Sequence, residues 1–257
     1  MTTVAEHYAT HLAPIYLWMA GGPAAALQAG AAEVEALNLP PVRGSVVLDL
    51  GAGFGMHSIP LARKGARVTA IDTSKELLST LAEISNGLPI KTVNDDLLEF
   101  QDHLSEAPSA IFCMGDTIAH LPDISHVESL IERASHELRP GGTFVVSFRD
   151  YSVPIVGDHR FIPVRSDDSR ILTCFLEYEP ASVLVHDIVH ERTTDGWQTH
   201  VSHYRKLRLS FEYLVEKFQS NGFNVRRETG MRGMVRVVAH KASNPSPPSG
   251  RSSHVER

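Results

Sequence analysis

The 257-residue sequence has few cysteines, no long apolar run and no excess of basic residues. Its two cysteines, Cys113 and Cys174, lie in strand-like apolar stretches, which predicts buried thiols in a reducing compartment. No run of about 18 apolar residues is present, so no membrane span is expected, and the N-terminal residues lack the pattern of a secretory signal. The formal net charge of −6 argues against a nucleic-acid-binding surface. These absences predict a cytoplasmic protein.

The composition that is present fits one α/β domain. Hydrophobic residues make up 42% of the chain and charged residues 21%, which is enough for one full core with modest additions. We expect a single domain over residues 1–241, in which residues 1–40 form a helical cover. Residues 242–257 are rich in Ser and Pro and lack an apolar face, so a disordered tail is predicted there.

Strand-like and helix-like segments alternate from residue 46 to residue 148. This alternation predicts parallel strands joined by right-handed crossovers, with ligands at the carboxyl ends of the strands. Two helices, Glu6 to Trp18 and Ala24 to Leu37, are expected before the first strand, with Pro14 kinking or splitting the first of them. Later helices are predicted to begin at capping boxes whose first residues are Thr73 and Ser125.

The alternation of strand-like and helix-like segments stops after Tyr151. Three β-rich runs, Ile171–Tyr178, Val183–Glu191 and Gln198–Leu209, follow one another without a helix, which predicts an antiparallel meander. A helix capped by Ser210 and two closing strands come next. Residues 152–209 are therefore expected to be an antiparallel β insertion after the fifth core strand.

A glycine-rich turn follows the first strand, Val46–Leu50. Gly51, Gly53 and Gly55 allow a ligand to approach the backbone closely, which indicates a nucleoside cofactor. Asp49 would repel a pyrophosphate but attract a sulfonium and an ammonium group, so S-adenosyl-L-methionine is favoured over NAD. A simple turn acid is the alternative interpretation of Asp49.

A second acid stands at the tip of the next strand. A carboxylate in the position of Asp72 can accept hydrogen bonds from both hydroxyls of a ribose. A cap for the following helix is the other interpretation of Asp72.

Together these motifs resemble the class I S-adenosylmethionine-dependent methyltransferases of the small-molecule type, such as glycine N-methyltransferases. The matching segments are Asp49–Gly55, Ile71-Asp72, Val93–Leu97 and Ala110–Leu121. The resemblance implies a Rossmann-like methyltransferase fold, with a mostly parallel seven-stranded sheet, helices on both faces and the insertion as a lid. It implies that Asp96 receives the adenine amino group. Asp96 matches the position of the family's acid better than Asp95 does, by a margin of one residue. It carries no role onto Asp116, where relatives often have Asn. The predicted cofactor-binding residues are Asp49, Gly51, Ala52, Gly53, Asp72, Thr73, Asp96, Leu97, Met114, Gly115 and Tyr16.

Residues on the acceptor side are predicted from their places beside the strand ends. His120 is the candidate general base, although a turn histidine bonded to backbone is an equal interpretation. Arg149 would grip a carboxylate or else anchor the insertion by a salt bridge. Tyr8 and Tyr16, together with Trp18, either wall the pocket or form a packed helix stripe. The predicted substrate-binding residues are Tyr8, Arg149, Tyr151, His186 and Tyr204.

His186 and His190 share one strand face and raise a metal hypothesis. Zinc needs a third converging ligand that the sequence does not supply, so no metal is expected. The predicted activity is methyl transfer to an O, N or S nucleophile of a small molecule, by a monomer or homodimer. A nucleic-acid or protein methyltransferase is the first alternative, disfavoured by the acidic balance and by the lack of an Asn/Asp-Pro-Pro-Tyr/Phe motif. The second alternative is a non-catalytic regulatory protein that binds the same cofactor.

Overall fold

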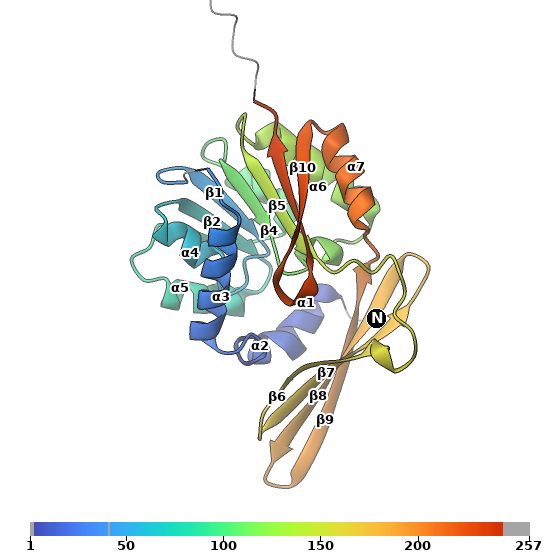
Figure 1. The fold of residues 1–257 in the computed structure, drawn as a ribbon. Coiled ribbons are helices and arrows are strands. Elements are labelled where there is room, and N and C mark those ends of the chain that lie inside the picture. The colour runs from blue at the N-terminus through green and yellow to red at the C-terminus, as the bar shows by residue number, and fades with distance from the viewer. Residues whose placement is uncertain (1–2, 41, 244–257) are drawn as a thin grey trace, which may run out of the picture.

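A seven-stranded sheet forms the centre of the computed structural model, which describes residues 3–40 and 42–243 (Figure 1). Its strand order is β10-β11-β5-β4-β1-β2-β3. Strands β1 to β5 pair in parallel, whereas β11 is antiparallel to both β5 and β10. The predicted mostly parallel sheet and its closing antiparallel pair are confirmed. The strands are β1 Val46–Leu50, β2 Arg67–Asp72, β3 Ile90–Asn94, β4 Ala110–Cys113, β5 Thr143–Phe148, β10 Phe223–Thr229 and β11 Val235–Lys241.

Helices cover both faces of this sheet, as predicted. One apolar cluster joins α6 and α7 to one face through side chains such as Leu130 and Phe218. A second cluster joins α3, α4 and α5 to the other face through Val34, Ile59 and Leu81. Apolar side chains on both faces bury β1 completely, which explains why all of its residues except Asp49 are apolar. The helices are α3 Pro23–Ala36, α4 Ser58–Arg63, α5 Lys75–Ile84, α6 Ile124–Glu137 and α7 Phe211–Ser220.

Two predicted helix starts are wrong by one or two residues. Ser74 caps α5 by accepting the Leu77 N–H, so the cap is not Thr73. Asp123, rather than Ser125, caps α6 by accepting the His126 N–H, and the Ser125 hydroxyl itself donates to Asp123. Both segments contain two neighbouring residues that can act as N-caps, and the capping-box spacing favoured the wrong one. The predicted Ser210 cap of α7 is confirmed.

The N-terminal segment forms a cover between the core sheet and the insertion (Figure 1). It consists of α1 Val4–His7, a π-helical turn at Tyr8–Leu12 and α2 Ala13–Met19. The predicted split near Pro14 is confirmed, since Pro14 lies in the first turn of α2, where its missing N–H costs little. Leu12 and Ile15 pack on Leu172 and Val189 of the insertion. The cover therefore connects the two sheets.

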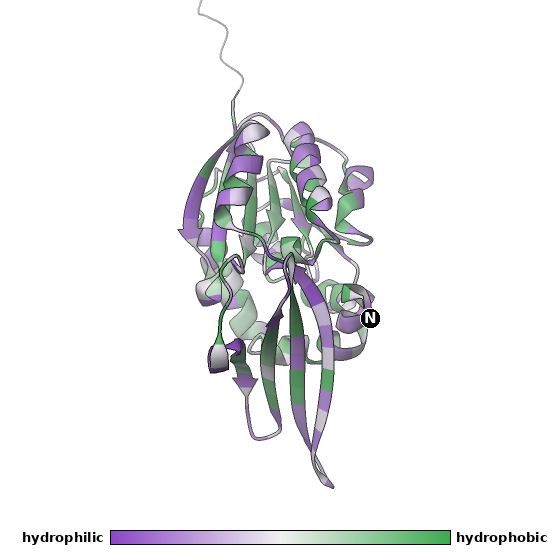
Figure 2. Ribbon diagram, turned by 90° about the vertical axis from the view of Figure 1, so that its right-hand side faces the viewer, coloured by the Kyte–Doolittle hydropathy of each residue, from purple (hydrophilic) through white to green (hydrophobic). Residues whose placement is uncertain are grey.

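The insertion is a four-stranded antiparallel sheet, where the sequence predicted three strands. Its order is β6-β7-β8-β9, with bounds Phe161–Ser166, Arg170–Tyr178, Ser182–Thr193 and Gly196–Leu207. The missed strand β6 is an edge strand with a register shift between Pro163 and Arg165, and proline is tolerated there because one side needs no partner. Figure 2 shows apolar and polar residues interspersed along these strands.

The predicted tail over residues 242–257 lies outside the described residues, apart from Ala242 and Ser243. Within the described part of the chain, no helix has both the length and the apolar character needed to cross a membrane.

Candidate functional site

A cavity of about 230 Å³ lies where the parallel strands β1 to β4 end. Such strand ends are where open α/β sheets bind ligands, because the connecting loops separate there. The core supplies most of its wall, and the N-terminal cover supplies the rest. Among the predicted site residues, those that line it are Gly51, Gly53, Asp72, Thr73, Asp96, Leu97, Met114, Gly115, Tyr16, Tyr8 and His120.

The glycine turn after β1 is held close to the cavity by its backbone. The N–H groups of Gly51 and Ala52 both donate to the Ile71 carbonyl, at 2.8 and 3.0 Å. Gly51 has φ +73°, and a Cβ there would lie 2.4 Å from Thr117 Cγ2. A larger residue would therefore be strained and would clash. Ala52 fixes the turn through its backbone and does not itself line the cavity.

Asp72 is fixed at the tip of β2. Its two carboxylate oxygens accept the N–H groups of Gly53 and Ser74, each at 2.7 Å. Burial raises the pKa of Asp72. The carboxylate joins the glycine turn to the start of α5, as a structural acid would, and it also lines the cavity. Asp72 is therefore both a local structural acid and a candidate ribose ligand.

Asp49 does not line the cavity. Its side chain is almost completely buried beneath the glycine turn and accepts a hydrogen bond from the Ser58 hydroxyl at 2.5 Å. Burial raises the pKa of this carboxyl as well. Asp49 can therefore act on a cationic ligand only through its electric field, and direct contact is not its role in this geometry.

The acids after β3 share the far end of the cavity. Asp95 accepts the Asp96 N–H and pairs with His103 at 2.8 Å. Asp96 accepts the Leu98 N–H at 2.9 Å and caps the short helix that follows. Both acids line the cavity, so the preference for Asp96 over Asp95 as the adenine ligand stays a prediction.

His120 stands at the cavity wall on a short 3-10 turn, Thr117–His120. Its ring stacks on Tyr204, with centroids 5.3 Å apart and planes 16° apart, and meets the edge of Tyr8. Neither ring nitrogen has a hydrogen-bond partner among the described residues. Burial, assisted by the nearby Lys206 ammonium, lowers the pKa of His120 to about 3. The imidazole is therefore neutral at pH 7 and is not bonded to backbone.

Two cations meet on the carboxylate of Asp116, beside the turn that carries His120. Lys206 Nζ donates to Oδ2 at 2.6 Å, and Arg149 donates its N–H to Oδ1 at 2.7 Å and its guanidinium to Oδ2 at 3.2 Å. Burial alone would raise the pKa of Asp116, but the two cations lower it to about 2. Arg149, which directly follows β5, therefore makes the salt bridge that the sequence offered as one interpretation. The contact that joins the core to the insertion is made by Lys206 of β9.

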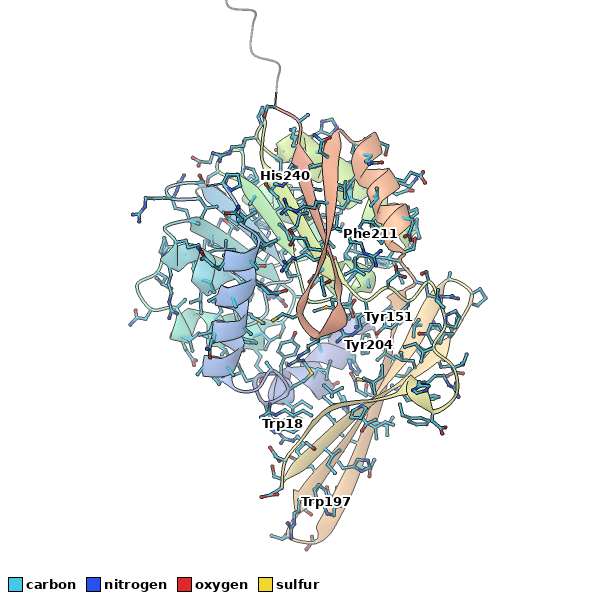
Figure 3. All side chains as sticks on the ribbon, in the orientation of Figure 1. Trp18, Tyr151, Trp197, Tyr204, Phe211 and His240 are labelled. Atoms are coloured by element: carbon cyan, nitrogen blue, oxygen red, sulfur yellow. The ribbon has the colours of Figure 1, made fainter. Side chains whose placement is uncertain are left out.

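The aromatic residues of the acceptor side separate into two groups. Tyr151 and Tyr204 belong to one buried cluster where the insertion meets the core (Figure 3). His186 lies on the other face of β8, beside Phe175, and its ring nitrogen is 3.2 Å from Glu177. The structure therefore does not bring His186 to the cavity. Among the described residues, no group of three or more His, Cys, Asp or Glu side chains is arranged to hold a metal.

Sequence reasoning missed several wall residues and the Lys206 contact. Val4, Thr117, Leu121 and Pro122 line the cavity without a motif to mark them. Lys206 did carry a signal, because it shares an inward strand face with Tyr204 and a buried lysine needs an anionic partner. The sequence alone did not say which carboxylate that partner would be.

A second hollow of about 650 Å³ adjoins the cavity, and we call it the groove. Both spaces are lined by Val4, His120, Leu121 and Pro122. On its other side the groove is bounded by Ser182 and by residues 205–207 of the insertion. His120 therefore stands at the boundary between the two spaces.

The fold and the cavity define a Rossmann-like α/β protein whose site suits a nucleoside ligand. Residues 47–142 match the family model described as a methyltransferase domain. The chain is 38% identical over 112 residues to a ubiquinone biosynthesis O-methyltransferase of Xylella fastidiosa, covering 42% of this chain and 43% of that one. It is 30% identical over 118 residues to glycine N-methyltransferase of Rattus norvegicus, covering 41% and 40%. Residues 47–142 therefore resemble a methyltransferase domain, and the fold around them is similar to that of solved S-adenosylmethionine-dependent methyltransferases.

A solved structure supports the fold over nearly the whole chain. The CcbJ methyltransferase of Streptomyces caelestis superposes with a TM-score of 0.73 at 22% identity, covering 92% of this chain and 98% of that one. This likeness includes the insertion as well as the core. The chain spans less than half the length of the two curated relatives, so the activity is argued below from the site.

Proposed function

We propose that the protein transfers a methyl group from S-adenosyl-L-methionine to an oxygen, nitrogen or sulfur atom of a small molecule. The observation that carries this proposal is the position of His120, a neutral imidazole with two open nitrogens at the wall of the cofactor cavity. A non-catalytic binding protein would have no need to keep such a group unpaired in a buried place.

The residues around the cavity fit the cofactor. Asp72 would hold the ribose, Asp96 the adenine amino group, and the turn at Gly51 and Gly53 would let the amino-acid end approach the backbone. The negative field of buried Asp49 and Asp72 favours the cationic end of this cofactor. Bound there, S-adenosyl-L-methionine supplies an activated methyl group on a sulfonium.

The chain itself has two tasks in the reaction. The cover and the insertion exclude water and hold the acceptor in line, with Tyr8 and Tyr16 as the aromatic walls. Tyr204 packs on His120, and neither Tyr204 nor Tyr151 lines the cavity itself. His120 accepts the proton when the acceptor carries one. Arg149 and Lys206 form salt bridges with Asp116 beside the turn that carries His120.

Calorimetry and a variant test this proposal. We expect S-adenosyl-L-methionine to bind and NAD not to bind, and binding of NAD alone would refute the cofactor assignment. His120→Gln should retain cofactor affinity while methyl transfer falls about 10²-fold to 10⁴-fold, the usual loss for a general base. Equal turnover by the variant would remove His120 from the mechanism. A mass-spectrometric screen of metabolites with isotope-labelled cofactor would identify the acceptor.

The finer parts of the proposal concern the setting of the protein. The acidic balance of −6 supports a small-molecule acceptor over nucleic acid. The two thiols without a disulfide support a cytoplasmic location. We propose a monomer or homodimer, which sedimentation of the purified protein would distinguish.

A further inference from the structure

One side of α3 lies against the segment that leaves the glycine turn. The buried residues Ala26, Gly30 and Glu33 follow one another at helical spacing, so they share this side of the helix. We call these three residues the α3 face. α3 and α4 lie on the same face of the core sheet (Figure 1), and the α3 face itself does not line the cavity.

The first two contacts of the α3 face depend on shape. Ala26 belongs to one buried apolar cluster with Phe54, the residue after Gly53. Gly30 lies so close to the turn that a Cβ built on it would be 2.0 Å from the Met56 carbonyl oxygen. Any larger residue at this position would push the helix and the turn apart.

The third contact of the α3 face is polar. Glu33 is 6% exposed, and its Oε2 lies 3.0 Å from His57 Nε2, which must be the donor because a carboxylate only accepts. Its Oε1 accepts the Met231 N–H at 3.2 Å and a guanidinium N–H of Arg236 at 3.4 Å. Burial alone would raise the pKa of Glu33, but these donors lower it, so the side chain is a carboxylate at pH 7.

His57 connects this carboxylate to the cofactor site. Its backbone forms the N-cap position of α4, and its ring stacks on Phe112 of β4 with planes 27° apart. The turn that ends at His57 begins at the glycines that line the cavity, where Asp72 accepts the Gly53 N–H at 2.7 Å. The turn is therefore held by one acid at Gly53 and by another, Glu33, at His57.

A charged contact is not needed for packing alone. Apolar residues of similar volume in place of a buried ion pair are often neutral or stabilising. A hydrogen bond to a carboxylate instead restricts both the distance and the angle of its donor. Binding sites need this restriction, because their groups must be held within about 0.5 Å of the productive geometry.

We infer that Glu33 is a positioning residue for the cofactor, which holds the glycine turn through His57 in the conformation that receives the amino-acid end of S-adenosyl-L-methionine. The inference rests on the proposed function, since it needs this cofactor in the cavity. Glu33 itself lies outside the cavity and takes no part in methyl transfer.

Glu33→Gln tests the inference with little change of shape. Gln has one acceptor oxygen and one NH₂ group, so it cannot accept from His57 on one side and from Met231 and Arg236 on the other. One donor is then left facing another donor. We expect the dissociation constant of S-adenosylhomocysteine, measured by titration calorimetry, to rise about tenfold. An unchanged dissociation constant would overturn the inference.

Glu228→Gln is the matched control. Glu228 pairs with the same Arg236 and also with Arg226, and it makes no contact with His57. This substitution should lower the midpoint of thermal unfolding, as Glu33→Gln does, while the dissociation constant stays within about twofold of the wild type. A tenfold loss of affinity in the control as well would mean that affinity merely follows stability.

Variants of His57 test whether Glu33 acts through this ring. His57→Leu removes the donor, whereas His57→Gln keeps an amide N–H for Glu33 and should retain most of the affinity. In the variant that combines Glu33→Gln with His57→Leu, the two losses should not add, so the total stays near tenfold instead of about 100-fold. A loss near 100-fold, or a Gln variant no better than Leu, would contradict the inference.

The wild type separates failure of this inference from failure of the proposed function. If the wild-type protein binds neither S-adenosyl-L-methionine nor S-adenosylhomocysteine, the proposed function and the inference both fail. If the wild type binds them and Glu33→Gln binds them equally well, the inference about Glu33 fails alone.

Discussion

We propose that buried Asp49 acts on the cofactor through its electric field, without touching it. The residue was identified from the sequence as a partner for a cationic ligand, and the structure places it under the glycine turn, bonded to Ser58. A field effect depends on the charge of the ligand, whereas a contact depends on its shape. The two can be separated by comparing S-adenosyl-L-methionine with S-adenosylhomocysteine, which lacks the sulfonium charge.

We therefore predict that Asp49→Asn weakens binding of S-adenosyl-L-methionine by roughly tenfold, or about 1.4 kcal/mol, and S-adenosylhomocysteine by much less. The Asn side chain keeps the size of Asp and can still accept from Ser58. Titration calorimetry measures both affinities. An equal loss for the two ligands would mean that the substitution acts through the shape of the turn.

His120 makes a second prediction, about stability and pH. Its pKa is 6.5 in a model compound and falls to about 3 in the folded protein, mainly because of burial. Between these values the unfolded chain binds a proton that the folded protein does not bind. The contribution of His120 to stability is therefore full above pH 6.5 and is lost as the pH falls toward 3, by up to about 1.4 kcal/mol per pH unit.

His120→Phe removes this titration while retaining a ring against Tyr204. We expect the free energy of unfolding of the wild type relative to the variant to decrease between pH 7 and pH 4.5. Urea unfolding at the two pH values measures it. A difference that stays constant would show that the ring is protonated equally in both states.

At the scale of elements, the cover and the insertion are joined by polar contacts inside an apolar interface. His7 of α1 is completely buried, and its ring nitrogens lie 2.9 Å from Asp187 of β8 and 2.7 Å from Ser202 of β9. His11 adds a contact to the Asp187 carbonyl at 3.1 Å. A buried pair of this kind fixes one register of helix on sheet, because any shift would leave both groups unpaired.

Asp187→Asn should accordingly cost roughly 1–3 kcal/mol of unfolding free energy, the usual penalty for disturbing a buried hydrogen bond to a charged group. Glu106→Gln, which removes the carboxylate of the exposed pair with Arg67, is the control and should cost less than about 1 kcal/mol. Chemical denaturation of both variants gives the comparison. Similar small losses would show that the His7 contact is not a stabilising pair.

Elements with a strong local signal were predictable from the sequence. The run Val46–Leu50 is apolar apart from Asp49 because both faces are covered, and α6 shows one apolar stripe that the core buries. Strand β6 was missed because an edge strand with Pro163 needs neither apolar alternation nor a full set of backbone donors. The cap of α6 was misplaced because Asp123 and Ser125 are both good caps, and only the backbone angles decide between them.

The site divides in the same way. Residues that follow a core strand, such as Asp72 and His120, could be placed because parallel strands end at one edge. The contact of Lys206 with Asp116 spans 90 positions and depends on how the insertion folds back over the core. No pattern in the sequence specifies that distance. The strand-end residues that line the cavity were therefore predictable and the Lys206–Asp116 contact was not, while the roles of these residues toward a cofactor stay predictions.

At the scale of the whole molecule, the cavity wall combines parts with different anchoring. The core side consists of strand ends within the central sheet, whereas Val4, Tyr8 and Tyr16 come from the N-terminal cover. The cover is held by the contacts of Leu12 and Ile15 with the insertion and of Ala13 with the core. Opening of the cover would remove one wall of the cavity without unfolding the core sheet.

A ligand that needs this wall must stabilise the closed cover by mass action. At S-adenosylhomocysteine concentrations near 100 times the dissociation constant, opening becomes about 100-fold less frequent, and amide exchange in residues 4–16 should slow by up to that factor. Hydrogen exchange followed by mass spectrometry measures it, with the β8–β9 turn at Thr193–Gly196 as a segment that should not change. Equal exchange of residues 4–16 with and without ligand would mean that the cover takes no part in binding, and the aromatic wall at Tyr8 and Tyr16 would then serve packing alone.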